Sequence, residues 1–318
     1  MQKEYGGFIE LEHCHGHMLH EDGIKLNSAQ NCLRYLIREK GIRTIWLPYF
    51  LCESVAEGCR KENTEVKFYH TDETLRPVFP DQIGEDEWMY IVNYYGQLRE
   101  DEISGYRDRF ARLILDNVQA YYHRPAADIP TIYSCRKYFG VADGGILSGI
   151  QPSAQEYETD LSFDRMEFLL GRFEKGANAF YSQYVGNNDL VGTLDIKYMS
   201  KLTESLLHGI EYDRIREVRE ENFRTLDEEL KEINALALTC PAAPFMYPLM
   251  VKNGPELRKK LIGSRIYVPK LWPMDYHSDL IETERRLADN ILPIPCDQRY
   301  TAEDMRYISS VVHNYLNA

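Results

Sequence analysis

Short, continuous apolar runs alternate with helical patterns over the first half of the chain. The runs lie at residues 44–47, 66–69, 88–94, 113–115, 131–133 and 145–147. Because few polar residues interrupt them, they are typical of strands buried on both faces. Helical patterns occupy residues 28–41, 51–63 and 100–110. The alternation predicts an α/β fold with a three-layer, mostly parallel sheet, which binds ligands beyond the carboxyl ends of its strands.

The second half of the chain has a different pattern. Long helices are predicted over residues 163–180 and 195–233, and the charged run at 211–221 is predicted to be a solvated helix face because opposite charges recur three or four residues apart. The pattern then predicts, in order, a strand at 245–251, a helix at 256–262, a strand at 265–268 and a helix at 302–315. We therefore predict a large domain at residues 1–233, including the connecting helices, and a small C-terminal α+β domain at 234–318.

Composition narrows the class of protein. The 318 residues carry a formal net charge of -13, which disfavours binding to nucleic acid or to an anionic membrane. The stretch at 233–251 is apolar but contains three prolines, so it is not expected to cross a membrane. The seven cysteines form no close CxxC pair, and the N-terminus does not read as a secretion signal. These features predict a cytoplasmic protein with reduced thiols.

The candidate chemistry lies between residues 116 and 145. Asp116 ends a buried run, where a carboxylate is costly unless it meets a cation, and Lys137 follows 21 residues later, close to two glycines. Alone, the aspartate could be a helix cap, and the lysine could be a chance match. Together they suit pyridoxal 5′-phosphate. Lys137 would form the Schiff base and move the proton, and Asp116 would pair with the pyridine nitrogen.

A phosphate site is predicted beside this pair. The Ser134 hydroxyl lies three residues before the lysine and could hydrogen-bond the cofactor phosphate. Backbone N–H groups at the start of the helix, from Ser28, Ala29 and Gln30, would complete the site, since a helix N-terminus favours an anion.

Three segments resemble the DegT/StrS group of pyridoxal-phosphate-dependent sugar aminotransferases, which have the aspartate-aminotransferase fold (fold type I). They are residues 92–97 (Val-Asn-Tyr-Tyr-Gly-Gln), residues 115–120 (Leu-Asp-Asn-Val-Gln-Ala), and Lys137 with the Asp-Gly-Gly that follows at 143–145. Weaker similarity extends over most of the chain. The resemblance implies that Lys137 carries the cofactor, that Asp116 holds the ring nitrogen and that Gln119 contacts the ring hydroxyl. It also implies a homodimer whose sites are completed by the partner chain.

The phosphate site departs from the family pattern. Ala29 and Gln30 stand where the family has a small residue followed by threonine. The family's phosphate serine, five residues before the lysine, is Ile132 here, whereas Ser134 has the spacing of the wider fold. These departures motivate an alternative hypothesis, in which the chain is a non-catalytic binding or regulatory protein that has kept the fold.

Two further family positions also differ. The aromatic residue that stacks on the cofactor ring is replaced by Cys52, so the resemblance moves this role to Tyr49 or Phe50. The loop that reaches the partner's site corresponds at most to residues 186–189, which include Asn188.

The residues favour a pyridoxal-phosphate-dependent enzyme, and the resemblance implies an aminotransferase that moves an amino group from glutamate or glutamine to a keto sugar nucleotide. The retained Lys137, Asp116 and Gln119 oppose the non-catalytic alternative, and the lysine argues against the family's dehydratase branch, which replaces it. Another pyridoxal-phosphate reaction, on an amino acid or an amino sugar, remains a second alternative. Arg136 and residues 270–272 are further candidates for contacts with substrate.

Alternate histidines at positions 13, 15 and 17 form a separate cluster. On a strand they would share one face and could bind zinc. No acidic or cysteine partner lies at a recognisable spacing, so we predict a polar N-terminal segment rather than a metal site.

Overall fold

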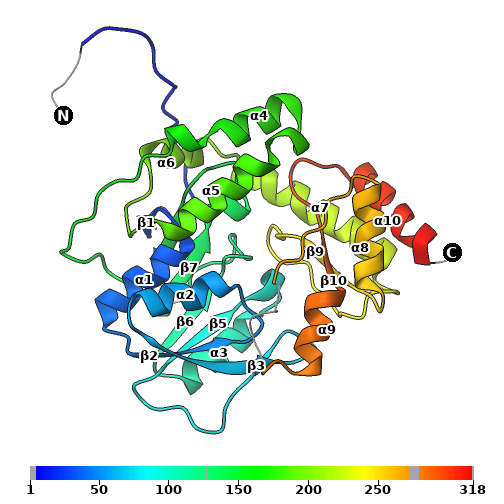
Figure 1. Ribbon diagram of the computed structural model, residues 1–318, viewed down its shortest axis with the longest axis horizontal. Helices are drawn as coiled ribbons and strands as arrows, with labels where there is room; N and C mark the ends of the chain where they lie inside the picture. The colour runs from blue at the N-terminus through cyan, green and yellow to red at the C-terminus, as the bar shows by residue number, and fades with distance from the viewer. Residues whose placement is uncertain (1–4, 127, 273–278, 317–318) are drawn as a thin grey trace.

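The computed structural model describes residues 5–126, 128–272 and 279–316, which form two lobes (Figure 1). The larger lobe contains an eight-stranded sheet in the order β1-β8-β7-β6-β5-β2-β3-β4. Its strands are β1 (Ile24–Leu26), β2 (Thr44–Pro48), β3 (Glu65–Thr71), β4 (Pro77–Val78), β5 (Trp88–Val92), β6 (Leu113–Asp116), β7 (Thr131–Ser134) and β8 (Gly145–Ser148). The neighbours from β7 to β3 run parallel, and β1, β8 and β4 pair antiparallel. The predicted mostly parallel sheet is confirmed.

Side chains of the central strands alternate between two apolar layers. Tyr90 and Ile114 face the layer that also contains residues of α1 (Ala29–Lys40) and α2 (Glu53–Lys61). Met89 and Leu113 face the opposite layer, together with Ile103 of α3 (Glu100–Arg109). Because successive strand residues point to opposite faces, both sides of the sheet must be covered, and the fold has three layers.

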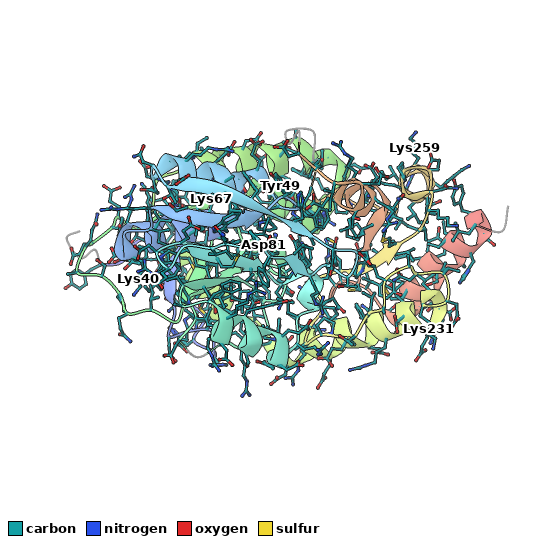
Figure 2. The ribbon with its side chains drawn as sticks, turned by 90° about the horizontal axis from the view of Figure 1, so that it is seen from below. Lys40, Tyr49, Lys67, Asp81, Lys231 and Lys259 are labelled. Atoms are coloured by element: carbon teal, nitrogen blue, oxygen red, sulfur yellow. The ribbon has the colours of Figure 1, made fainter. Side chains whose placement is uncertain are left out.

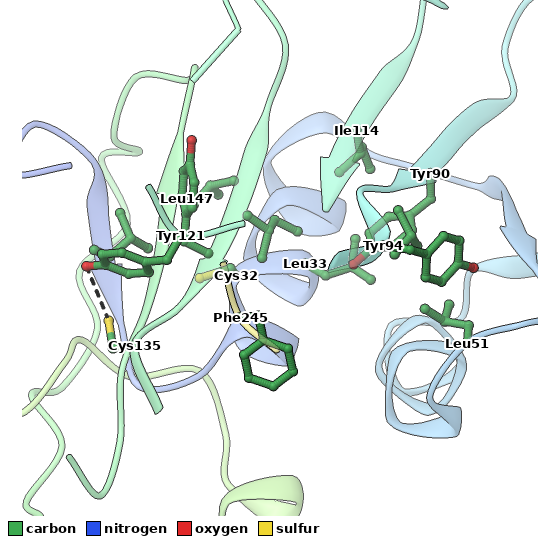
Figure 3. Packing of buried hydrophobic residues seen from close by; sticks show 14 of the residues in the cluster. Cys32, Leu33, Leu51, Tyr90, Tyr94, Ile114, Tyr121, Cys135, Leu147 and Phe245 are labelled. Atoms are coloured by element: carbon green, nitrogen blue, oxygen red, sulfur yellow. Dashed lines mark hydrogen bonds between the residues drawn. The ribbon is translucent and has the colours of Figure 1, made fainter. Parts of the chain in front are cut away.

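Figure 3 shows the first apolar layer from close by, with Cys32 and Leu33 of α1 lying near Ile114 and Leu147 of the sheet. The start of α1 is set by Ser28, whose hydroxyl accepts a hydrogen bond from the N–H of Asn31 at 3.1 Å. The helix therefore has the N-cap that the sequence predicted. Its first turn lies next to β8, at the edge of the candidate site.

The connecting region is divided into more helices than the sequence predicted. Over 163–193 the chain forms η3 (Phe163–Arg165), α4 (Glu167–Lys175), η4 (Asn178–Phe180) and α5 (Tyr181–Thr193). Over 201–230 it forms α6 (Lys201–His208) and α7 (Tyr212–Leu230). Gly176 ends α4 with a φ of 99°, a conformation that glycine adopts without strain. The single helices predicted over 163–180 and 195–233 are therefore wrong in extent.

The smaller lobe is built around the two-stranded antiparallel sheet of β9 (Tyr247–Met250) and β10 (Ile291–Ile294). Its helices are α8 (Gly254–Gly263), α9 (Glu282–Asn290) and α10 (Ala302–Leu316). The strand predicted at 265–268 is absent, because Arg265 has a φ of 61° and the chain turns back after α8. Figure 2 shows the lobes side by side, with Tyr49 and Lys67 on the larger and Lys259 on the smaller.

The N-terminal segment before β1 runs away from the larger lobe in Figure 1 and carries exposed Phe8 and Ile9. Among the described residues, no helix has both the length and the apolar character needed to span a membrane.

Candidate active site

Neighbouring parallel strands end at one edge of the sheet, and their last residues lie at the candidate site. β6 ends at Asp116 and β7 ends at Ser134. From Ser134 the chain enters the short helix η2 (Cys135–Lys137), and it returns as the antiparallel strand β8. A backbone hydrogen bond of 3.2 Å from Cys135 N to Gly144 O closes this connection. The carboxyl ends of the parallel strands thus place Lys137 within electrostatic reach of Asp116.

Asp116 is a buried carboxylate, with 2% of its surface exposed. The Tyr90 hydroxyl donates a hydrogen bond of 2.7 Å to Oδ2, and the Val118 N–H donates one of 2.9 Å to Oδ1. Burial raises the pKa of Asp116, since desolvation disfavours the ionised form, while Lys137 and the two hydrogen bonds act in the opposite direction. A cation bound against this carboxylate would offset the cost of its burial.

Lys137 is surrounded by protein groups but remains accessible to solvent. Desolvation lowers the pKa of its ammonium group, and the attraction of Asp116 opposes that change. Nζ lies 5.8 Å from the centre of the Phe245 ring, which comes from the segment just before β9. An accessible amine with a lowered pKa is suited to nucleophilic chemistry, because more of it is neutral at a given pH.

Gln119 stabilises the turn that follows β5. Its Oε1 accepts a hydrogen bond of 2.8 Å from the N–H of Tyr95, which has a φ of 53°. Its backbone carbonyl accepts a bond of 2.8 Å from the Tyr138 hydroxyl. The structure therefore shows Gln119 connecting the residue after Lys137 to the end of β5, and gives its side chain a structural partner besides the predicted cofactor.

The start of α1 lies against β8. A Cβ atom at Gly145 would lie 2.4 Å from the carbonyl carbon of Ser28 and 2.5 Å from the nitrogen of Ala29. Only glycine allows this approach, so the Gly-Gly pair brings the helix N-terminus next to η2. Within the described residues the Ser134 hydroxyl forms no hydrogen bond, which leaves it available to an anion at this point.

Gln30 and Cys52 lie where α1 meets α2. The Gln30 Nε2 donates a hydrogen bond of 2.6 Å to the Ser54 carbonyl, and Cys52 Sγ lies 3.1 Å from the Ser54 hydroxyl. Cys52 is exposed and is close enough to Lys137 to affect the pKa of its ammonium group. Of the altered residues, Cys52 thus lies near the lysine, and Gln30 connects α1 to the start of α2.

The two aromatic candidates for ring stacking have different surroundings. Phe50 is fully buried, and its ring centre lies 4.6 Å from that of Trp272. Tyr49 is partly buried and stacks on His70, with ring centres 4.8 Å apart. Phe50 is thus part of the core, whereas Tyr49 lies partly at the surface.

Residues 186–189 form part of helix α5, so the prediction of a loop at these residues is wrong. No proline interrupts residues 181–193, and the helical hydrogen bonds are retained. Asn188 faces η2 of the same chain, where its Oδ1 accepts a hydrogen bond from the Arg136 guanidinium. Asn187 Nδ2 donates a bond of 3.0 Å to the Ala142 carbonyl. Helix α5 therefore packs directly over the turn that carries Lys137.

The sequence matches no protein-family model and no curated protein. Solved structures are similar in fold. The sugar aminotransferase CalS13 from Micromonospora echinospora has 15% sequence identity and a TM-score of 0.67, over 92% of this chain and 86% of that one. This chain has the fold of that enzyme.

A DegT DnrJ EryC1 StrS aminotransferase from Brucella abortus has 15% identity and a TM-score of 0.60, over 92% and 85% of the two chains. The PLP-form of the putative sugar aminotransferase Spr1654 from Streptococcus pneumoniae has 13% identity and a TM-score of 0.61, over 92% and 87%. The resemblance seen in the sequence is confirmed at the level of the fold.

Three residues near Lys137 escaped the sequence-based prediction. Tyr90 could have been suspected, because it places a hydroxyl in the middle of an apolar run. Phe245 had no such signal, since it is brought to Lys137 from a segment more than 100 residues away. Arg219 was assigned to a solvated face, but it is 1% exposed.

Arg219 connects α7, the start of the smaller lobe and the turn after Lys137. Its guanidinium donates to the Gln298 Oε1 at 2.8 Å, to the Pro244 carbonyl at 2.8 Å and to the Tyr138 carbonyl at 3.3 Å. Several acceptors thus satisfy a buried cation without a carboxylate in direct contact. The link joins the two lobes next to the candidate lysine.

The N-terminal histidines lie on an irregular segment, so the strand considered for them is not formed. His13 and His15 are exposed, with ring centres 6.5 Å apart. Over the described ranges, no three His, Cys, Asp or Glu side chains are grouped as a metal site would require.

Two shallow hollows occur elsewhere on the surface, around residues 80–87. Lys67 and Glu87 line the first, and form an ion pair there. This region precedes β5, at the amino ends of the parallel strands, whereas Asp116 and Lys137 lie at the carboxyl ends. The hollows have no part in the candidate chemistry.

Proposed function

We propose that this chain is a pyridoxal-phosphate-dependent aminotransferase that moves an amino group from glutamate or glutamine to a keto sugar nucleotide. The observation that carries the proposal is the arrangement of Asp116 and Lys137 at the carboxyl ends of adjacent strands. The similarity in fold to sugar aminotransferases, at 13–15% identity, supports the class of reaction.

The residues around Lys137 fit the proposed cofactor. Asp116 is a buried carboxylate that would be stabilised by a protonated ring nitrogen. The Ser134 hydroxyl and the N-terminus of α1, brought close by Gly145, offer donors to a phosphate. When bound, pyridoxal phosphate withdraws electrons from the substrate's Cα. Lys137 would hold the cofactor covalently and, once displaced by the amino donor, would move the proton from Cα.

The first half of transamination tests this function, because it needs only the amino donor. We expect protein carrying the cofactor on Lys137 to be yellow. Adding glutamate or glutamine without any sugar should remove that colour and release one equivalent of the matching keto acid, with pyridoxamine phosphate left on the protein. Absorbance spectra and keto-acid release measure both changes.

The alternatives give different outcomes in the same experiment. A non-catalytic binding protein would keep its colour with every amino acid, and a decarboxylase or racemase would consume donor without accumulating stoichiometric pyridoxamine phosphate. If several donors leave the colour unchanged while the Schiff base is demonstrably present, the aminotransferase proposal is wrong.

A homodimer is the second part of the proposal. Large apolar side chains are exposed on and next to α4 and α5, a pair of helices packed over the turn of Lys137. They are Leu161, Phe163, Leu170, Phe173, Tyr181, Tyr184 and Leu190. Phe173 is 93% exposed and Leu170 is 63% exposed. Burying such a surface against a second copy would remove apolar area from water and place the partner beside the site.

We expect the purified chain to have the mass of two 37.2-kDa chains in size exclusion with light scattering. Replacing both Leu170 and Phe173 with serine should shift it to the mass of one chain, because the interface loses two exposed apolar side chains of α4, including its most exposed one, Phe173. A matched control is Tyr307→Ser on α10, a residue that is also exposed but lies on the other lobe. A wild-type monomer with full activity would remove the dimer proposal.

Two further proposals concern the chain as a whole. We propose a cytoplasmic location, which is supported by seven cysteines that all remain free thiols. We also propose that the domain boundary lies near residue 233, because α7 ends at Leu230 and the separate two-stranded sheet follows it.

A further inference from the structure

Arg136, next to the candidate lysine, has no carboxylate in direct contact among the described residues. It is half-buried, and its guanidinium donates to Asn188 Oδ1 on α5. Throughout the described ranges, no carboxylate lies within ion-pair distance of it. Arg34 shows the usual arrangement, since it is buried and contacts Glu62 at 2.7 Å. A desolvated guanidinium with a single neutral partner is typical of a site that receives an anion.

Arg165 of η3 carries a second guanidinium, which lies within electrostatic reach of Arg136. It is 9% exposed, and its Nη2 donates to Asp160 Oδ2 at 2.7 Å and to the Leu161 carbonyl at 2.8 Å. Its Nη1 is buried and has no hydrogen-bond partner within the described structure. Burial lowers the pKa of Arg136, and the positive charge of Arg165 adds to that effect, so the two groups lie within electrostatic reach.

The acidic groups around Arg136 are already engaged by other partners. The Asp143 carboxylate accepts hydrogen bonds from the Ser200 N–H and hydroxyl, each 2.8 Å long, and from the Thr203 hydroxyl. Asp160 is paired with Arg165. The remaining titratable group that acts on Arg136 is the Tyr184 hydroxyl of α5. The donors to Asp143 are neutral, so this carboxylate keeps its charge and attracts Arg136, but it does not contact it. Among the described residues, the guanidinium of Arg136 has Asn188 as its hydrogen-bond partner and no carboxylate in contact, so donors remain for an anion from outside the chain.

We propose that Arg136 binds a phosphate-type oxyanion beside Lys137. The proposal deepens the proposed function and rests on it for the source of the anion, which is either the cofactor's phosphate or a phosphate of the sugar nucleotide. A guanidinium holds two phosphate oxygens at once, which an ammonium does not do. The site would also attract an anionic ligand to a chain whose net charge is -13.

Inorganic phosphate is the probe for the site itself. Calorimetric titration of the full-length, cofactor-free chain should show saturable binding that Arg136→Gln weakens by about tenfold or more, because two charge-assisted hydrogen bonds are lost. Arg136→Lys should bind phosphate with intermediate affinity, since lysine keeps the positive charge but cannot donate two parallel hydrogen bonds as a guanidinium does. Arg172→Gln on α4, an exposed arginine of a neighbouring helix, is the matched control and should bind phosphate as the wild type does.

Two further arms identify the source of the anion. If the cofactor supplies it, Arg136→Gln should lose the wild type's preference for pyridoxal 5′-phosphate over unphosphorylated pyridoxal. If the substrate supplies it, the variant should bind the cofactor normally and show a raised KM for the sugar nucleotide, with the donor half-reaction unchanged. Both outcomes support the proposal.

The inference and the proposed function can fail separately. If phosphate binding depends on Arg136 but the chain forms no Schiff base on Lys137, the anion site is supported and the aminotransferase proposal is wrong. An active enzyme in which Arg136→Gln and Arg136→Lys match Arg172→Gln in phosphate affinity, cofactor preference and KM would overturn the anion site alone. The anion site would also be overturned if the wild type does not bind phosphate and all three variants have the same cofactor preference and the same KM.

Discussion

Lys137→Ala is expected to abolish covalent attachment of the cofactor. Borohydride treatment of the wild type should leave pyridoxal phosphate bonded to the peptide that contains Lys137, and the variant should carry no label. The donor half-reaction should slow by about 10²–10⁴-fold or more, the usual contribution of a positioned general base, with the loss of covalent attachment added to it. Mass spectrometry of the reduced, digested protein and single-turnover absorbance measure the two effects.

The variant should remain folded. Lys137 is accessible to solvent, so its side chain adds little to the core, and Asp116 keeps its hydrogen bonds from Tyr90 and Val118 when the ammonium group is removed. Lys259→Ala is the matched control, because Lys259 is an exposed lysine of α8 in the other lobe. That control should keep both label and rate. If the label is recovered on a different lysine, that lysine and not Lys137 forms the Schiff base.

Asp116→Asn is expected to retain the Schiff base but to slow proton removal by about a hundredfold or more, which corresponds to about 2.7 kcal/mol of barrier. A neutral amide does not hold the ring nitrogen in its protonated form, so negative charge at Cα is less stabilised. Stopped-flow absorbance with glutamate separates Schiff-base formation from the proton step. Near-normal turnover would mean that Asp116 has only a structural role.

Tyr90→Phe provides a graded control for this prediction. The Tyr90 hydroxyl donates to Asp116 Oδ2 at 2.7 Å, and this hydrogen bond favours the ionised carboxylate. Its removal keeps the negative charge but raises the pKa of Asp116 further, so we expect a smaller loss of rate than in Asp116→Asn. A larger loss would indicate that the tyrosine itself contributes to catalysis.

The stability of the cofactor-free chain should change in the opposite direction from activity. Because the folded pKa of Asp116 lies above its ordinary value of 3.8, the carboxyl group ionises more readily in the unfolded chain, and the folded wild type loses stability as pH rises through this interval. Asp116→Asn removes that loss. Its unfolding midpoint at neutral pH should equal or exceed that of the wild type, and the difference should shrink as pH falls toward 3.8.

Local pattern alone was enough to predict the large sheet and the position of its candidate chemistry. Buried parallel strands need continuous apolar runs, so β2, β5 and β6 could be read directly from residue order. Since parallel strands end at the same edge of a sheet, residue order also predicted that Asp116 and Ser134 lie at that edge. The environment of Gln119 was not predictable in the same way, because its contact with Tyr95 depends on a turn with positive φ.

What the tertiary structure decided concerns residues whose partners are distant in the chain. Arg219 has the sequence surroundings of a solvated helix face, yet packing of the smaller lobe buries it against carbonyl groups that local pattern cannot locate. Asn188 was expected in a loop, and α5 instead carries it to Arg136. Apolar periodicity reports which side of an element is buried, but it does not report what lies on that side. The sequence by itself therefore determined the sheet and the positions of Asp116 and Lys137 along it. Only long-range packing determined which of the charged groups beside them are paired within the chain and which have donors left for a ligand.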